Sequence, residues 1–251
     1  MKQNNNATND SLLNIWPALV DVVIATLMIL LLFIIIQYLA FFLSDALKRM
    51  DILERQGRFE AMFNDMIKSF KSQEGFNKLF SENKKKGDNK KESKFQCITN
   101  GDHQILRFSS ELLFDKGKAE ISSNEIDRFS FLHSLGALLH KAYYKERLYD
   151  QIYIEGHTDN DQIRGRLKET FDTNWELSTS RAIFIMKFLT NVDNKYSVPS
   201  KNNKYLVPII DEKRFLGVAG YAEFNKLVNN DSDENKGKNR RIEILLVYSE
   251  R

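Results

Sequence analysis

The chain has 251 residues, enough for one sizeable folded domain and additional segments. Its 37 lysine and arginine residues nearly balance 34 aspartate and glutamate residues, which argues against a dedicated nucleic-acid-binding protein. The single cysteine, Cys97, excludes an internal disulfide, and the four scattered histidines have no zinc-binding spacing. The sequence also lacks a glycine-rich phosphate loop and a Gly-x-Ser-x-Gly elbow, so we expect neither an enzyme nor a bound metal or cofactor.

A strongly apolar segment, residues 16–43, follows a short tail of residues 1–15. From residue 18 to residue 43, the clearly polar residues are Asp21, Thr26 and Gln37. About 20 helical residues span the hydrocarbon core of a bilayer, so this segment is long enough to cross a membrane. It is longer than the core of a signal peptide, the tail carries only Lys2, and no A-x-A-like cleavage site follows. We therefore expect a retained transmembrane helix.

The charges on either side of this segment bear on its orientation. Lys2 precedes the segment, and four basic residues follow it, namely Lys48, Arg49, Arg55 and Arg58. The positive-inside rule, taken alone, places the C-terminal part of the chain in the cytoplasm. The rule weakens when a long domain is translocated, so this count is contrary evidence and does not decide the orientation.

Residues 44–80 carry apolar side chains at helical spacing and predict an amphipathic helix, interrupted near Gly57. One interpretation is a stalk or coiled-coil seam that continues the membrane helix. The other is a plug that lies on the membrane or occludes a channel. Residues 81–94 contain no apolar side chain and predict a solvated, flexible linker.

Residues 95–251 predict a folded domain of alternating strands and helices. Two short strand-like runs flank Asn100-Gly101, a strong hairpin signal. Apolar residues then recur at helical spacing over residues 126–139, and a strand ends near Gly156. Thr173 and Glu176 form a capping box at the start of the next helix. Two further strand-like runs, residues 214–224 and 239–249, complete an α+β sandwich, a mixed sheet with helices on one face.

Four ordered motifs mark this domain. They are Gly156-His157-Thr158-Asp159, the run Asn174-Trp175-Glu176-Leu177-Ser178, Arg181-Ala182, and Asn239-Arg240-Arg241. Together they resemble the peptidoglycan-binding OmpA/MotB C-terminal domain, and residues 112–121 resemble that family's loop after its first strand. The long segment between Asp159 and Asn174 resembles MotB more than simple OmpA-like domains.

The ligand that this resemblance implies has two charges. A peptidoglycan stem peptide with diaminopimelate carries an ammonium and a carboxylate, which an aspartate and an arginine can hold a fixed distance apart. The resemblance assigns this clamp to Asp159 and Arg181. It also implies a groove lined by Asn174, Leu177, Phe114 and Arg240. The alternative is that Asp159 and Arg181 pair with each other as a structural salt bridge.

Other polar or aromatic residues of these motifs have simpler interpretations. We interpret His157 as a structural residue at a strand end, because no serine, cysteine or metal set accompanies it recognisably. Arg241 and Glu243 are expected on a solvated face. Trp175 is expected to pack at the start of its helix.

Asp21 lies inside the apolar segment, where an ionisable residue suggests a functional site. A carboxyl group balanced between burial and a nearby cation or water can take up and release a proton. The alternative is an interfacial acid that reaches the lipid headgroups. Thr26 either assists ion binding or bonds back to its own helix.

Trp16, Asp21 and the long aliphatic run after them resemble the B subunits of ion-driven stator complexes. These include MotB, the Zorya B protein and, more distantly, ExbD and TolR. Leu-Val-Asp-Val-Val around Asp21 departs from the Tyr-Ala-Asp-Phe-Met-Thr usual in flagellar MotB and is closer to the Leu-x-Asp-Val of ExbD and TolR.

The resemblance implies two copies of this chain inside a ring of five multi-spanning MotA-like or ZorA-like A subunits. It also implies a bacterial inner-membrane location with a periplasmic C-terminal domain and translocated H⁺ or Na⁺. The near balance of charges predicts no nucleic-acid partner. The expected function is an ion-driven motor subunit moored to peptidoglycan, of the flagellar type or the Zorya anti-phage type. A passive tether between membrane and wall is the alternative.

Overall fold

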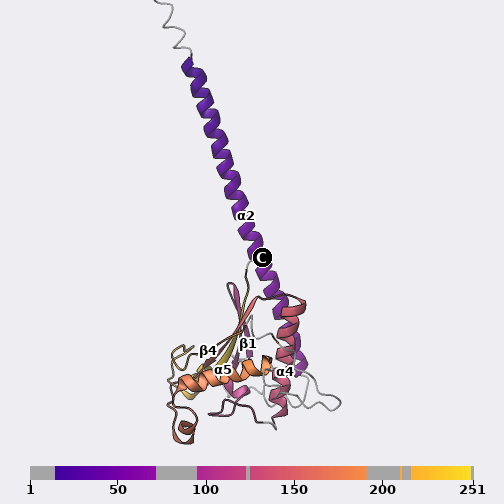
Figure 1. The fold of residues 1–251 in the computed structure, drawn as a ribbon, viewed down its shortest axis with the longest axis vertical. Coiled ribbons are helices and arrows are strands. Elements are labelled where there is room, and N and C mark those ends of the chain that lie inside the picture. Colours follow the sequence, from indigo (N-terminus) through magenta and orange to yellow (C-terminus); the bar gives the residue numbers. More distant parts are fainter. Residues whose placement is uncertain (1–14, 72–94, 123–124, 191–209, 211–215, 250–251) are drawn as a thin grey trace, which may run out of the picture. The chain divides into compact units, whose positions relative to one another are not determined.

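This computed structural model describes residues 15–71, 95–122, 125–190, 210 and 216–249 (Figure 1). The tail up to residue 14, residues 72–80 and the whole predicted linker, residues 81–94, lie outside the described residues. The chain divides into two units, residues 1–51 and residues 52–251.

The first unit contains the N-terminal part of helix α2, which runs from Ile15 to Lys71. The apolar side chains of residues 15–43 are exposed. By length and composition α2 can cross a membrane, since its most apolar window of 18 residues has a mean hydropathy of 3.1. The apolar helix predicted for residues 16–43 is therefore present. The helix continues through Gly57 without the predicted interruption, because one glycine costs a helix only about 1 kcal/mol.

The second unit is built on a five-stranded sheet in the order β1-β2-β5-β3-β4. Its strands are β1 (Phe95–Asn100), β2 (His103–Ser109), β3 (Gln151–His157), β4 (Leu216–Gly220) and β5 (Arg241–Val247). The β3–β4 pair is parallel and the other pairs are antiparallel, so the sheet is mixed as predicted. Gly101 forms the predicted β1–β2 turn with a φ of +61°, which glycine adopts without strain.

Helices cover one face of this sheet. The longer ones are α4 (Ile126–His140), which continues into the π-helical turn η2 (Lys141–Lys145), and α5 (Asn174–Thr190). The described residues also form three short helical segments, η1 (Ser110–Leu112), η3 (Gly165–Glu169) and α7 (Asp233–Asn239). Ile242, Ile244 and Leu246 of β5 alternate toward the core and are fully buried. The fold class predicted from the sequence, an apolar helix and an α+β domain with helices on one sheet face, is confirmed.

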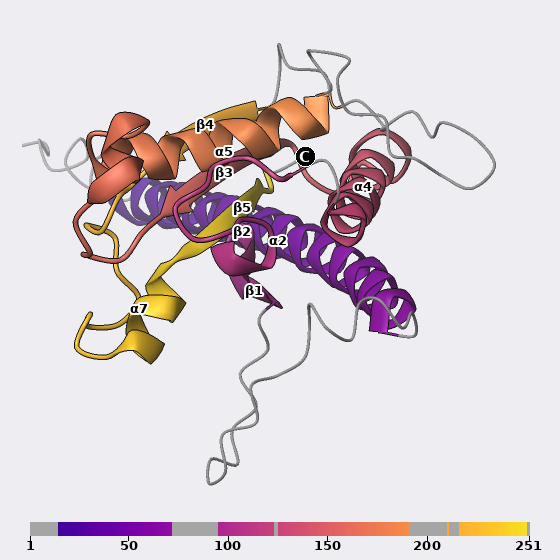
Figure 2. The ribbon, with the colours of Figure 1, turned by 90° about the horizontal axis from the view of Figure 1, so that it is seen from below.

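Helix α5 lies across β3 and β4 (Figure 2). Two glycines permit this close approach. A Cβ atom on Gly156 would lie 2.1 Å from the backbone oxygen of Ser178, and one on Gly220 would lie 2.1 Å from Thr179 Oγ1. The start of α5 keeps half of the predicted capping box, because Thr173 Oγ1 accepts from the Glu176 backbone N–H while the Glu176 carboxylate accepts from the Asp172 N–H.

The C-terminal part of α2, from residue 52, belongs to the second unit and packs into its core. The Phe63 ring stacks on Phe95 with centroids 4.9 Å apart, and Phe59 contacts the Tyr149 ring edge-on. Arg55 is buried as well, and its Nη2 atom donates to the Ser249 carbonyl at 2.7 Å. The core therefore extends beyond the predicted domain of residues 95–251, because a helix between the predicted membrane segment and linker supplies part of it.

Candidate functional site

The sequence motifs meet where strands β2, β3 and β5 approach α5. Strand β3 ends at His157 and leads directly to Asp159, while Arg240 immediately precedes β5. The Ser110 backbone N–H donates to the Arg240 carbonyl at 2.9 Å, which joins η1 to the start of β5. Helix α5 is held against β3 and carries Arg181 on its buried side. Arg181 is therefore carried by a helix, while Asp159 and Arg240 lie next to the ends of strands β3 and β5.

Asp159 pairs with Arg240 rather than with Arg181. The distance from Arg240 Nη1 to Asp159 Oδ2 is 2.6 Å, and the Asp159 side chain is 8% exposed. Arg240 Nη2 also lies 2.7 Å from Glu111 Oε1, so this guanidinium bridges two carboxylates. The backbone carbonyl of Asp159 accepts from Asn174 Nδ2 at 3.2 Å, which fixes the loop after β3 to the start of α5.

Arg181 is buried among neutral partners. Its Nε atom donates to the Lys118 carbonyl at 2.9 Å, and its Nη1 atom donates to Ser110 Oγ at 3.4 Å. Its guanidinium carbon lies 5.5 Å from the centre of the Phe114 ring, a cation–π contact. In the part of the chain that the structure describes, no carboxylate lies within 4.0 Å of Arg181 and Nη2 has no hydrogen-bond partner. The predicted alternative, a direct Asp159–Arg181 salt bridge, is therefore absent.

Burial disfavours the charge on Arg181. The pKa of Arg181 is lowered to about 10, first by loss of hydration and then by the positive charge of Arg240, while Asp159 and Glu111 act in the opposite sense. A negatively charged group placed against this guanidinium would offset that cost.

The remaining predicted residues surround this pair of arginines. Phe114 is buried and packs edge-on against Phe184, with ring centroids 5.6 Å apart. Leu177 is buried in the first part of α5. Phe114 and Leu177 thus pack on the core side of the site, and they do not form an exposed apolar surface there. Trp175, which we expected to pack, is 48% exposed and stacks on Phe224.

Sequence reasoning missed Glu111 and the role of Asn239. Glu111 lies immediately before residues 112–121, the run that resembles the family's loop, so the noted motif ended one residue short of it. Asn239 is fully buried, and its Oδ1 atom accepts from the backbone N–H groups of Leu227 and Val228 at 2.8 Å and 3.2 Å. It therefore shapes the loop before β5 and holds Arg240 in place.

The prediction that Arg241 and Glu243 lie on a solvated face is wrong. They point away from the helices but are only 2% and 6% exposed. Arg241 Nη2 donates to the Asn225 carbonyl at 3.0 Å, and its Nε atom donates to Glu243 Oε1 at 2.8 Å. Alternation along the strand correctly predicts the direction of these side chains. It cannot reveal that the loop before β5 supplies contacts on that face.

In the membrane segment, the structure bears on Thr26 but not on the role of Asp21. Thr26 Oγ1 donates to the Val23 carbonyl at 2.8 Å, as expected for a hydroxyl that bonds back to its own helix. Asp21 lies on the exposed surface of α2 in the same segment. The assignment of an ion to Asp21 and Thr26 stays a prediction.

No protein-family model matches the chain. It is 30% identical over 145 residues to the uncharacterised protein YtxE of Bacillus subtilis (strain 168), covering 58% of this chain and 48% of that protein. It is 27% identical over 160 residues to motility protein B of the same organism, covering 64% and 51%. The chain thus spans about half the length of the curated relatives it matches.

Solved structures with a similar arrangement include the periplasmic domain of Helicobacter pylori MotB. That structure is 23% identical, with a TM-score of 0.47, and the match covers 61% of this chain and 88% of that one. A MotB-like protein from Desulfovibrio vulgaris is 21% identical, with a TM-score of 0.48 and coverage of 80% and 97%. In sequence, the chain is similar to motility protein B over more than half of its own length.

Proposed function

We propose that this chain is the B subunit of an ion-driven membrane motor and moors that motor to peptidoglycan through its C-terminal domain. The observation that carries the proposal is the buried guanidinium of Arg181, which has neutral partners and lies in one cluster with the Asp159–Arg240 pair. The sequence similarity to motility protein B supports the same assignment.

The charges of the site match a stem peptide with diaminopimelate. The ligand carboxylate binds Arg181 through Nη2, which makes no hydrogen bond to the described residues. Its negative charge offsets the loss of hydration at this buried guanidinium. The ligand ammonium binds the Asp159 carboxylate beside Arg240. Asn174 holds the Asp159 loop in place, and Phe114 and Leu177 keep the arginine in position from the core side.

The N-terminal helix supplies the ion-coupling part of the proposal. Asp21, assisted by Thr26, carries the translocated H⁺ or Na⁺ at the contact with a multi-spanning MotA-like or ZorA-like A subunit. Two copies of this chain lie inside a ring of five A subunits in the bacterial inner membrane, and each C-terminal domain is periplasmic. An acid in an apolar segment is costly unless it faces a protein partner or a water path, which such a ring provides.

Because the cell wall holds the dimer in place, ion flow through the complex turns the ring of A subunits. A change of charge at Asp21 releases its contact with the A subunit, and the ring then turns about a dimer held by the wall. The output is flagellar motility or Zorya-type anti-phage defence. The alternative function is a passive tether between membrane and wall, in which the same domain binds peptidoglycan but Asp21 carries no ion. A measurement of ion flux distinguishes the two functions.

The test is ion flux through the full-length chain reconstituted with its A subunit in vesicles. Asp21→Asn removes the charge and should abolish flux while the complex still assembles. Asp45→Asn is the matched control, because Asp45 lies on the same helix and pairs with Arg49 at 2.9 Å. Flux that survives Asp21→Asn at the native rate would refute ion carriage by this residue, and a native complex without flux would favour the passive tether.

A further inference from the structure

Two glutamates and a histidine meet on the sheet face opposite the core. We call Glu155, His157 and Glu243 the Glu155 cluster. Glu155 of β3 lies directly across from Glu243 of β5, and His157 is on the same face of β3 two residues later. This pairing brings together residues that are far apart in the sequence, so spacing along the chain could not reveal them. The proposed peptidoglycan site does not use them.

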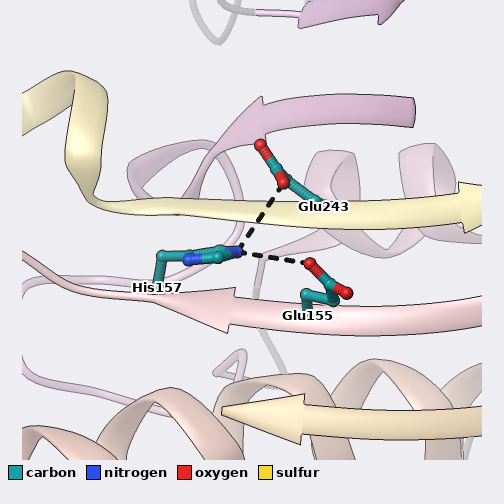
Figure 3. A group of neighbouring side chains, drawn as sticks. All are labelled: Glu155, His157 and Glu243. Carbon is teal, nitrogen blue, oxygen red and sulfur yellow. Dashed lines mark ion pairs between the residues drawn. The ribbon is translucent and has the colours of Figure 1, made fainter. Parts of the chain in front are cut away.

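His157 is fully buried, and neither of its ring nitrogens has a hydrogen-bond partner among the described residues. Figure 3 shows that Nε2 points between the two carboxylates. It lies 3.7 Å from Glu155 Oε2 and 3.7 Å from Glu243 Oε2, beyond the range of a hydrogen bond. Buried polar groups are nearly always satisfied, so this imidazole points to a partner that bonds to Nε2.

The donor atoms have the spacing of ligands around one ion. One nitrogen and two carboxylate oxygens lie within 4.8 Å of one another. A tetrahedral ion with bonds of about 2.0–2.2 Å holds its donor atoms roughly 3.3–3.6 Å apart, so small side-chain adjustments close the site. Neutral imidazole and carboxylate are both established ligands of such ions.

Neighbouring residues already orient two of the three ligands, Glu243 and His157. Glu243 Oε1 accepts from Arg107 Nε at 2.6 Å and from Arg241 Nε at 2.8 Å, which leaves Oε2 directed at His157. The Tyr221 ring stacks on the imidazole at 5.3 Å with an interplanar angle of 11°. Such outer partners commonly fix the direction of metal ligands. Here they hold both the carboxylate and the imidazole in place.

Charge and ligand type narrow the identity of the ion. The guanidinium groups of Arg107 and Arg241 repel a bound cation. A site with carboxylate ligands alone would therefore have a low affinity for the ion. Ca²⁺ and Mg²⁺ need six or more oxygen ligands, whereas an imidazole nitrogen suits Zn²⁺, Co²⁺ and Ni²⁺. We propose that the Glu155 cluster binds one divalent transition-metal ion of the Zn²⁺ class, which ties β3 to β5 two residues before Asp159.

Full-length, untagged chain in detergent tests this proposal after chelator treatment. Titration with Zn²⁺ by calorimetry, and with Co²⁺ by visible absorption, should show one ion per chain and the bands of a low-coordinate Co²⁺ centre. His157→Gln should weaken Zn²⁺ binding at least about tenfold, as for the loss of a metal-site partner. His103→Gln is the matched control, because His103 is a partly exposed histidine beside Asp102, with 2.6 Å between Nδ1 and Oδ1.

Glu155→Gln provides a second variant in case the buried histidine is needed for folding. Glu155 is the most exposed of the three ligands, so this variant should fold without metal and bind Zn²⁺ at least about tenfold more weakly. Zn²⁺ should raise the melting temperature of the native chain and of His103→Gln by more than that of Glu155→Gln. Absence of stoichiometric binding, or binding that both ligand variants retain, would overturn the proposal.

Discussion

Arg240 donates a hydrogen bond to Asp159, with 2.6 Å between Nη1 and Oδ2, and binds Glu111 through the same guanidinium. One guanidinium thus pairs with two carboxylates at the candidate site. Arg181, buried nearby, keeps a guanidinium edge without an anionic partner among the described residues. The two arginines therefore have different tasks. Arg240 holds the Asp159 side chain in position, and in the proposed function Arg181 binds the ligand carboxylate.

Arg181→Lys should weaken binding to purified peptidoglycan sacculi, because lysine keeps the charge and loses the planar fork that can hold a carboxylate. A charged hydrogen bond is worth about 1.5–3 kcal/mol, so the dissociation constant should rise between roughly tenfold and 150-fold. Cosedimentation at a series of sacculus concentrations measures this change.

Lys226→Ala is the control for Arg181→Lys, because Lys226 is exposed and bonds only to Asn229 in the described part of the chain. A stem peptide with lysine lacks the second carboxylate of diaminopimelate and should bind the native chain more weakly. Arg181→Lys should reduce this preference. A variant that keeps full affinity and full preference would show that Arg181 is structural.

Phe59→Ala should destabilise the second unit by about 3–5 kcal/mol, the usual cost of removing a buried phenylalanine. Phe59 is fully buried and contacts the Tyr149 ring, with centroids 6.3 Å apart. Thermal or denaturant unfolding in detergent, followed by near-ultraviolet circular dichroism, measures the loss. Leu53→Ala, on the exposed side of the same helix, should change stability by less than about 1 kcal/mol. Equal effects of the two substitutions would contradict packing of α2 against the domain.

Two glycine substitutions should have opposite signs. Gly156→Ala places a Cβ atom 2.1 Å from the Ser178 backbone oxygen, so α5 must move away from β3 and stability must fall. Gly57→Ala meets no atom within 4 Å and should stabilise α2 by about 1 kcal/mol. Melting temperatures of the two variants check both signs. A Gly156→Ala variant as stable as the native chain would refute the close approach of helix and strand.

Cys97 should be protected from alkylation in the folded chain. Burial, and secondarily the negative charge of Glu60, raises the pKa of Cys97 from 9.0 to about 12. Between pH 9 and pH 12 the folded thiol keeps a proton that the unfolded chain loses, so this group's contribution to the free energy of unfolding falls as the pH rises. Iodoacetamide reacts with the thiolate, so at pH 9 it should modify the native chain much more slowly than the unfolded chain.

Mass spectrometry of time points at pH 9 measures the Cys97 reaction, with Cys97→Ser as the unlabelled control. Phe59→Ala should speed modification of Cys97, because Glu60 lies next to Phe59 on the helix that shields this thiol. Equal rates for the native and unfolded chains would contradict the burial of the thiol.

Local patterns in the sequence predicted most of the elements. Asn100-Gly101 marks a real hairpin turn, and Thr173 caps α5 at the predicted position. The alternation over β5 correctly separates the buried Ile242, Ile244 and Leu246 from the opposite face. These features depend on residues that are a few positions apart in the sequence. Their conformational preferences and spacing favour the element without any tertiary contact.

Only the tertiary structure decided which distant groups meet. It paired Asp159 with Arg240 instead of Arg181, brought Glu155 opposite Glu243, and placed Phe59 in the core. Sheet register and helix docking depend on the sum of many contacts between remote segments, and no short stretch of sequence contains that sum. The amino-acid sequence therefore determined the elements and the residue types of the site, and folding determined their partners.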